Sequence, residues 1–99
     1  MMLRITAVSG EQKGITHDYS TLPITIGRYP DNDIVITDGI VSRRHCAILP
    51  AEAGTLLHDM GSQNGTYLNG VKIGGDSILV TGDVITVGII NLQVTICDS

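Results

Sequence analysis

A chain of 99 residues is long enough for one domain with its own hydrophobic core and too short for two. Its formal net charge of −4 argues against a nucleic-acid-binding protein, which would usually carry a broad basic surface. Hydrophobic residues make up 42% of the chain, mostly Ile, Val and Leu with no Trp or Phe, and branched aliphatic side chains favour strands.

Short strand candidates follow one another along the chain, separated by glycine, proline and polar turn residues. We predict strands at residues 2–8, 15–19, 23–27, 34–36, 44–49, 55–59, 67–68, 71–73, 77–80, 84–87 and 90–96. Pro50 closes the fifth of these, and Asn69-Gly70 is the strongest hairpin signal, because both central residues of a type I′ turn need positive φ. The pattern predicts an all-β fold, an antiparallel β-sandwich of about eleven short strands, as a single domain over residues 1–99.

The cysteines Cys46 and Cys97 lie inside apolar runs without CxxC spacing, and we interpret both as small buried hydrophobic residues. His45 is adjacent to Cys46, but no second ligand pair follows, so we expect no metal site and no cofactor. No apolar run is long enough to span a membrane and we find no signal-peptide pattern, so we expect a cytoplasmic location without membrane insertion.

Three polar segments lie between the predicted strands, at residues 26–28, 42–45 and 61–66. Such segments should gather at one end of a sandwich, because they are the loops that connect its strands. In the first segment, Arg28 has a side chain suited to a phosphate, since a guanidinium donates two parallel hydrogen bonds and keeps its charge. In the second, the hydroxyl and backbone N–H of Ser42 can both point at one phosphate oxygen.

The remaining residues of the second segment have different expected roles. Arg43 can add positive charge to the site, whereas strand alternation would direct Arg44 to the opposite face, as a solvated charge or a peptide contact. His45 follows Ser42 by three positions, so its ring can hydrogen-bond loop backbone and fix the orientation of the serine. The same pattern would also fit an ordinary polar turn at the start of a strand.

In this order, the segments resemble the forkhead-associated (FHA) domain, a phosphothreonine-binding module, with the motif core at residues 26–70. The third segment, Ser62-Gln63-Asn64-Gly65-Thr66, looks like the Ser/Thr-x-Asn-Gly-Thr loop of this family. The resemblance implies a phosphopeptide-binding surface composed of Arg28, Ser42, Arg43, Gln63 and Asn64. Many relatives have Ser or Thr where this chain has Gln63, so we expect Gln63 to contribute its backbone N–H.

The resemblance also implies a set of residues that hold the loops in shape, namely Gly27, His45, Gly65, Thr66, Asn69 and Gly70. We expect Gly27 to let the backbone turn sharply after its strand and Gly65 to adopt positive φ. Thr66 is expected to satisfy loop carbonyl groups from inside the domain.

The function implied is recognition of phosphothreonine in a partner protein, for signalling that depends on Ser/Thr kinases or for complex assembly. We expect a bacterial domain that is monomeric in isolation and binds no nucleic acid. The alternative is a scaffold that keeps the FHA sandwich but assembles without phosphate. We expect no catalytic residues. A triad could be drawn from Ser42, His45 and either His58 or Asp59, but no glycine-flanked nucleophile elbow surrounds the serine.

Overall fold

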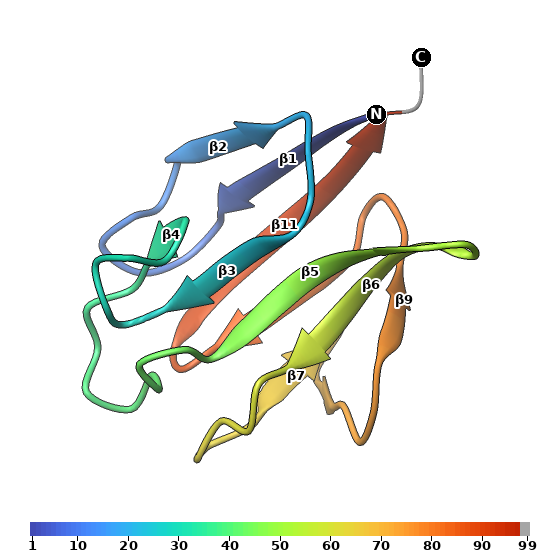
Figure 1. Cartoon of the computed structure of the whole chain (residues 1–99). Helices are drawn as coiled ribbons and strands as arrows, with labels where there is room; N and C mark the ends of the chain where they lie inside the picture. The colour runs from blue at the N-terminus through green and yellow to red at the C-terminus, as the bar shows by residue number, and fades with distance from the viewer. Residues whose placement is uncertain (98–99) are drawn as a thin grey trace.

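The computed structural model describes residues 1–97, which form strands and turns without any helix (Figure 1). The strands are β1 (Met2–Ala7), β2 (Thr16–Tyr19), β3 (Ile24–Gly27), β4 (Ile34–Val35), β5 (Cys46–Ala51), β6 (Gly54–Asp59), β7 (Thr66–Leu68), β8 (Val71–Lys72), β9 (Ser77–Leu79), β10 (Val84–Val87) and β11 (Ile90–Cys97). Within this part of the chain there is accordingly no helix long and apolar enough to cross a membrane.

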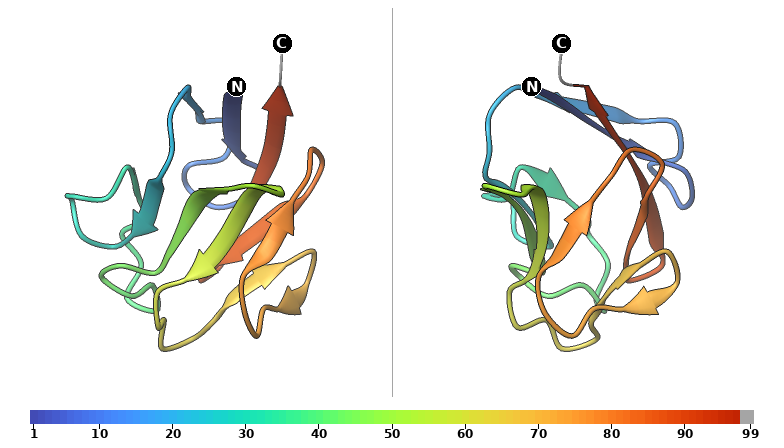
Figure 2. Two further views of the ribbon diagram at one scale, coloured as in Figure 1. Left: turned by 45° about the vertical axis from the view of Figure 1, so that its right-hand side comes forward. Right: turned by 90° about the vertical axis from the view of Figure 1, so that its right-hand side faces the viewer.

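Two sheets face one another and form the layers of a sandwich (Figure 2). One sheet has the strand order β2-β1-β11-β10-β7-β8, and the other has the order β4-β3-β5-β6-β9. All paired strands are antiparallel except β3 and β4, which are parallel. The predicted all-β sandwich is therefore confirmed, with one parallel pair at the edge of the second sheet.

The core between the sheets consists of aliphatic side chains from alternate strand positions. In β1, Leu3 and Ile5 are fully buried, and in the neighbouring β11 Leu92 and Val94 face the same interior. Each such side chain contributes roughly 1.5–3 kcal/mol to stability by its burial. The alternating pattern of the sequence is thus the main determinant of these two strands.

The two cysteines lie in different environments. Cys46 is fully buried in the core as predicted, and burial raises the pKa of its thiol to about 12. Cys97 is exposed, so its predicted burial is wrong. The reason is the register of β11: Leu92 and Val94 point inward, so the odd-numbered residues that end the strand point to solvent.

Strand β5 continues through Pro50, which we expected to end it. The pairing of β3 with β5 stops at Ile48, whereas the pairing of β5 with β6 continues to Ala51. Proline is tolerated where one side of a strand has no partner, because its missing N–H then removes no ladder hydrogen bond. The tendency of Pro50 to end a strand was thus outweighed by the hairpin that β5 forms with β6.

The Asn69-Gly70 turn joins β7 and β8 with φ values of 51° and 84°, the positive values that a type I′ turn requires. This part of the prediction is confirmed. The side chain of Asn69 also accepts a hydrogen bond from the backbone N–H of Val84 at 2.9 Å and donates to Asp83 at 3.0 Å. Asn69 therefore attaches the hairpin to the start of β10.

Three loops lie at the end of the sandwich opposite the N-terminus (Figure 1). They connect β3 to β4 (residues 28–33), β4 to β5 (residues 36–45) and β6 to β7 (residues 60–65). These loops include most of the polar residues that the sequence singled out, so the fold brings segments distant in sequence to one end of the domain.

Candidate anion-binding site

A concavity of about 380 Å³ lies among these loops, lined by Arg28, Ser42, Arg43, Arg44 and Gln63. Four of the five residues expected to bind a ligand are thus together in one place, and the fifth, Asn64, directly follows Gln63 in the sequence. A larger concavity of about 540 Å³ lies elsewhere, along the edge strand β9, and no charged side chain lines it. An anion requires cationic groups and hydrogen-bond donors, so the smaller concavity is the candidate site.

Arg28 is held in place by the loop between β4 and β5. Its backbone N–H donates to the carbonyl oxygen of Ser42 at 3.0 Å, and its Nε donates to the carbonyl oxygen of Val41, also at 3.0 Å. Within residues 1–97 the two terminal nitrogens of the guanidinium have no protein acceptor. They are therefore available to form a parallel pair of hydrogen bonds with an oxyanion.

Tyr29 contacts two of the arginines, and sequence reasoning did not identify it. The guanidinium carbon of Arg28 lies 5.5 Å from the centre of the tyrosine ring, and that of Arg43 lies 5.3 Å from it. The negative face of an aromatic ring attracts cations at this distance. Tyr29 thus keeps two like charges close together, as binding of a doubly charged anion requires.

Ser42 and His45 are linked through backbone as well as side chain. The backbone N–H of Ser42 donates to Nδ1 of His45 at 3.1 Å, so this ring nitrogen is the acceptor and the proton resides on Nε2. Nε2 in turn donates to the carbonyl oxygen of Gly65 at 2.8 Å. The fully buried imidazole of His45 therefore bridges two of the three loops.

Gln63 and Asn64 make specific contacts across the loops. The backbone N–H of Gln63, which we expected to face a ligand, donates to Oγ of Ser42 at 3.1 Å. Gln63 therefore orients the serine hydroxyl, which remains able to donate its own proton. Nδ2 of Asn64 donates to the carbonyl oxygen of Ile40 at 2.8 Å, and this bond does not use the amide oxygen, which can accept a hydrogen bond.

Asp59 organises the loop between β6 and β7, although the sequence suggested only an implausible triad for it. Its carboxylate accepts hydrogen bonds from the backbone of Gly61 (2.7 Å), the backbone and hydroxyl of Ser62 (2.8 and 2.5 Å) and the hydroxyl of Thr66 (2.7 Å). Burial acts to raise the pKa of the Asp59 carboxyl, but these hydrogen bonds outweigh it and lower the pKa to about 2.

The contact of Thr66 differs from the expectation that it satisfies loop carbonyls. Its hydroxyl is fully buried and donates to the Asp59 carboxylate, because an ionised carboxylate is the stronger acceptor. Gly65, just before it, has a φ of 86°, the positive value expected of it. A signal for Asp59 exists in the sequence, since an aspartate two residues before a glycine often caps a turn.

Gly27 is required for a different reason than the predicted sharp turn. It belongs to β3, and a Cβ atom there would lie 2.3 Å from the carbonyl oxygen of Arg43 and 2.8 Å from Nδ2 of Asn32. The absence of a side chain lets the loop approach the strand closely. Asn32 fixes this contact from a buried position, since its Nδ2 donates to the carbonyl oxygens of Tyr29 and Arg43, both at 2.8 Å.

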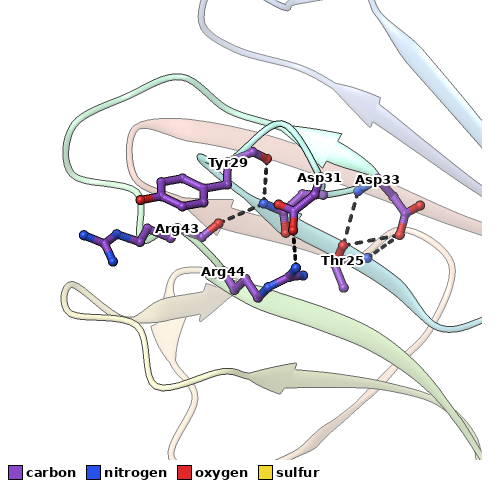
Figure 3. Close-up of polar contacts among 7 residues, drawn as sticks. Thr25, Tyr29, Asp31, Asp33, Arg43 and Arg44 are labelled. Atoms are coloured by element: carbon purple, nitrogen blue, oxygen red, sulfur yellow. Dashed lines mark hydrogen bonds and ion pairs between the residues drawn. The ribbon is translucent and has the colours of Figure 1, made fainter.

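Arg44 lines the same concavity as Arg43 and does not face away from it. Strand alternation does not apply here, because residues 42–45 lie in a loop and β5 begins only at Cys46. The Arg44 guanidinium forms an ion pair with Asp31 of the loop after β3, beside Tyr29 and Arg43 (Figure 3). Three arginines therefore line the concavity, and one of them has an acidic partner.

Comparisons with known proteins agree on one family. Residues 24–88 match the family model of the FHA domain. The chain is 44% identical over 69 residues to the ABC transporter ATP-binding/permease protein Rv1747 of Mycobacterium tuberculosis, a match that spans 70% of this chain and 8% of that protein. It is 33% identical over 70 residues to the FHA domain-containing protein FhaB of Mycolicibacterium smegmatis, spanning 71% of this chain and 45% of FhaB.

Among solved structures, the N-terminal FHA domain from S. cerevisiae Rad53p, in complex with a phosphothreonine peptide, has a TM-score of 0.86 and 29% identity. That match covers 98% of this chain and 94% of the yeast chain. The chain spans less than half the length of the two curated relatives, and both are bacterial proteins, which supports a bacterial origin.

Proposed function

The chain belongs to the FHA-domain family, and on this premise we propose that it is a binding module for phosphothreonine in partner proteins. The observation that carries the proposal is the convergence of Arg28, Ser42 and Arg43 on one concavity. The relative solved with a phosphothreonine peptide has the same fold over nearly the whole chain, which supports this type of ligand.

The donors available match the chemistry of a phosphate ester. A phosphothreonine carries a charge of about −1.5 to −2 and three acceptor oxygens. We assign the terminal nitrogens of Arg28 to two parallel hydrogen bonds and the hydroxyl of Ser42 to a third, with Arg43 adding charge. Asn64 is assigned to the peptide backbone beside the phosphate, through the amide oxygen that its contact with Ile40 leaves available.

The remaining site residues are assigned to holding the loops. His45 and Gly65 connect two loops through the imidazole ring, and Thr66 joins the Asp59 carboxylate. Gly27 permits the close approach of Arg43, and the Asn69-Gly70 turn positions the hairpin that follows the third loop. A site built on such fixed loops loses little conformational entropy when it binds a peptide.

We assign binding and not catalysis to the serine and histidine. A serine nucleophile needs a ring nitrogen that accepts the proton of its hydroxyl. Here Nδ1 of His45 accepts from the backbone N–H of Ser42, and Nε2 donates to Gly65. Both ring nitrogens are thus engaged with backbone, in keeping with the family, whose members are phosphopeptide-binding modules.

The wider role that we propose is Ser/Thr-kinase-dependent signalling or complex assembly, with residues 1–99 acting as one monomeric FHA domain. Kinases form phosphothreonine by transferring a phosphoryl group from ATP to a threonine hydroxyl, and ATP is a cytoplasmic substrate. We therefore propose that the domain works in the cytoplasm. Both curated relatives are longer than this chain, so the same domain is found as part of larger proteins.

Fluorescence anisotropy with one labelled peptide in three forms tests the proposal: with threonine, phosphothreonine or glutamate at the central position. We expect measurable binding of the phosphothreonine form only, because a single carboxylate has less charge and fewer acceptors than a phosphate. Arg28→Ala should weaken binding about tenfold or more, since a hydrogen bond to a charged group is worth about 1.5–3 kcal/mol.

The matched control is Arg4→Ala, which removes an exposed arginine from β1 in the other sheet. This variant should bind as tightly as the wild type. Equal binding of all three peptides would favour a scaffold that assembles without phosphate, and unchanged affinity of Arg28→Ala would refute the assignment of the concavity.

A further inference from the structure

We propose, on the basis of the phosphothreonine binding proposed above, that Asp31 sets the charge selectivity of the peptide-binding surface. By pairing with Arg44, Asp31 disfavours peptides that carry a second acidic or phosphorylated residue beside the phosphothreonine and favours those with a basic residue there. Sequence motifs did not point to Asp31, since it lies in a turn between the first two polar segments.

The position of the ion pair is the first support. Arg44 lines the concavity together with Arg28 and Arg43, and its guanidinium contacts the Oδ2 atom of Asp31. Both side chains are about half exposed, at 48% for Arg44 and 55% for Asp31. Because Arg44 lines the concavity and pairs with Asp31, a peptide bound there would lie close to this ion pair, which Figure 3 shows beside Tyr29 and Arg43.

The number of charges is the second support. Arg28, Arg43 and Arg44 contribute three positive charges to the concavity, whereas a phosphothreonine contributes about −1.5 to −2. Asp31 offsets one of the three, so that two remain, the number that a single phosphate neutralises. Without Asp31, one guanidinium would be left over and would attract a second anion.

The conformation of the loop is the third support. Asn32 donates to the carbonyl oxygens of Tyr29 and Arg43, which fixes the backbone on both sides of the pair. The other acidic residue of this loop, Asp33, accepts hydrogen bonds from the backbone N–H and hydroxyl of Thr25 at 2.8 and 3.4 Å. Asp33 is thus bound to strand β3, and Asp31 is the acidic residue of this loop that pairs with an arginine of the concavity.

The size of the effect follows from the exposure of the pair. Interactions between exposed charges are modest, and they control which partner is accepted more than total affinity. We expect Asp31→Asn to improve the binding of a phosphothreonine peptide with an acidic neighbour about two- to fivefold more than that of its neutral counterpart.

The experiment is a positional scan with one phosphothreonine peptide in which each flanking position is replaced in turn by Ala, Asp or Lys. The proteins are the wild type, Asp31→Asn, Arg44→Gln and the double variant. Asp18→Asn is the control, because Asp18 pairs with Arg4 in an equally exposed ion pair on the other sheet and its replacement changes the net charge identically. Affinities are measured by fluorescence anisotropy at 0.05 and 0.3 M salt.

In the Asp31→Asn variant, we expect the preference for a flanking peptide residue to shift from Lys towards Asp. This shift should occur at one or two peptide positions only and should be larger at low salt. The shift should be absent when Arg44 is already glutamine, since the selectivity acts through this side chain. If Asp31→Asn changes all positions alike, as Asp18→Asn does, the role of Asp31 is refuted while phosphothreonine binding stands. If the wild type binds none of the phosphopeptides, the proposed function itself fails.

Discussion

The carboxylate of Asp59 should stabilise the fold in a manner that depends on pH, and Asp59→Asn removes this contribution. Asparagine has one acceptor oxygen in place of two and carries no charge, so it cannot satisfy the four donors of Gly61, Ser62 and Thr66. The loop between β6 and β7, which includes Gln63 and Asn64, would lose its central acceptor.

The lowered pKa of Asp59 sets the magnitude of its contribution to the unfolding free energy. A fall from the ordinary value of 3.8 to about 2 corresponds to about 2.4 kcal/mol of preferential stabilisation of the charged form. Because the carboxylate is partly exposed, solvent screening reduces this to about 1–2 kcal/mol of unfolding free energy.

The direction of the pH dependence follows from linkage. The folded-state pKa lies below the unfolded-state value, so the unfolded chain takes up the proton first as the pH falls. The stabilisation by Asp59 is fully present above about pH 4 and is lost between about pH 4 and pH 2. The unfolding free energies of the wild type and Asp59→Asn should therefore converge over this window.

Urea unfolding followed by circular dichroism at pH 6, 4, 3 and 2.5 measures this convergence. Comparison of the two proteins cancels the titration of all other acidic groups. Asp18→Asn is the control, because Asp18 is exposed on the other sheet, and its difference from the wild type should be much smaller at every pH. A gap between wild type and Asp59→Asn that stays constant from pH 6 to 2.5 would refute the role assigned to the carboxylate.

Two further predictions separate structure from recognition. His45→Ala should lower the unfolding free energy by about 2–4 kcal/mol, because it leaves two backbone groups of different loops without partners. Ser42→Ala should weaken phosphopeptide binding and lower the unfolding free energy by less than about 1 kcal/mol. Denaturant unfolding and fluorescence anisotropy measure both effects, and the opposite behaviour of the two variants would contradict the assigned roles. Phosphothreonine peptides should bind at least several-fold more tightly than phosphoserine peptides, since burial of the additional methyl group is worth about 0.8 kcal/mol, and equal affinities in calorimetry would show that the methyl group is not enclosed.

The strands and the hairpin could be predicted from the sequence because their signals are local. Alternation in β1 and β11 specifies which side chains are buried, and Asn69-Gly70 is one of the dipeptides that favour positive φ at both turn positions. Pro50 shows the limit of local signals, since its effect depended on where the pairing between β3 and β5 ends. The prediction that Arg44 faces away from Arg43 was wrong for a similar reason. Side chains alternate only within a strand, and β5 begins after Arg44.

The resemblance to a family predicted which residues would share one surface, and four of them line the concavity, but the residues that support them were not predicted. Tyr29, Asn32 and Asp59 act between loops that are distant in sequence, so their partners are known only once the fold brings those loops together. Gly27 illustrates the same point: its importance lies in the carbonyl oxygen of Arg43, sixteen positions later in the chain, and not in its own backbone conformation.

The central claim is that the concavity between the three loops binds phosphothreonine, and an NMR titration of the ¹⁵N-labelled domain tests it most directly. Addition of a phosphothreonine peptide should perturb the side-chain Nε–H signal of Arg28 and the backbone amides of Ser42, Arg43 and Gln63, and the unphosphorylated peptide should perturb none of them. Perturbations that are the same with both peptides, or that map to the apolar concavity along β9, would contradict the claim.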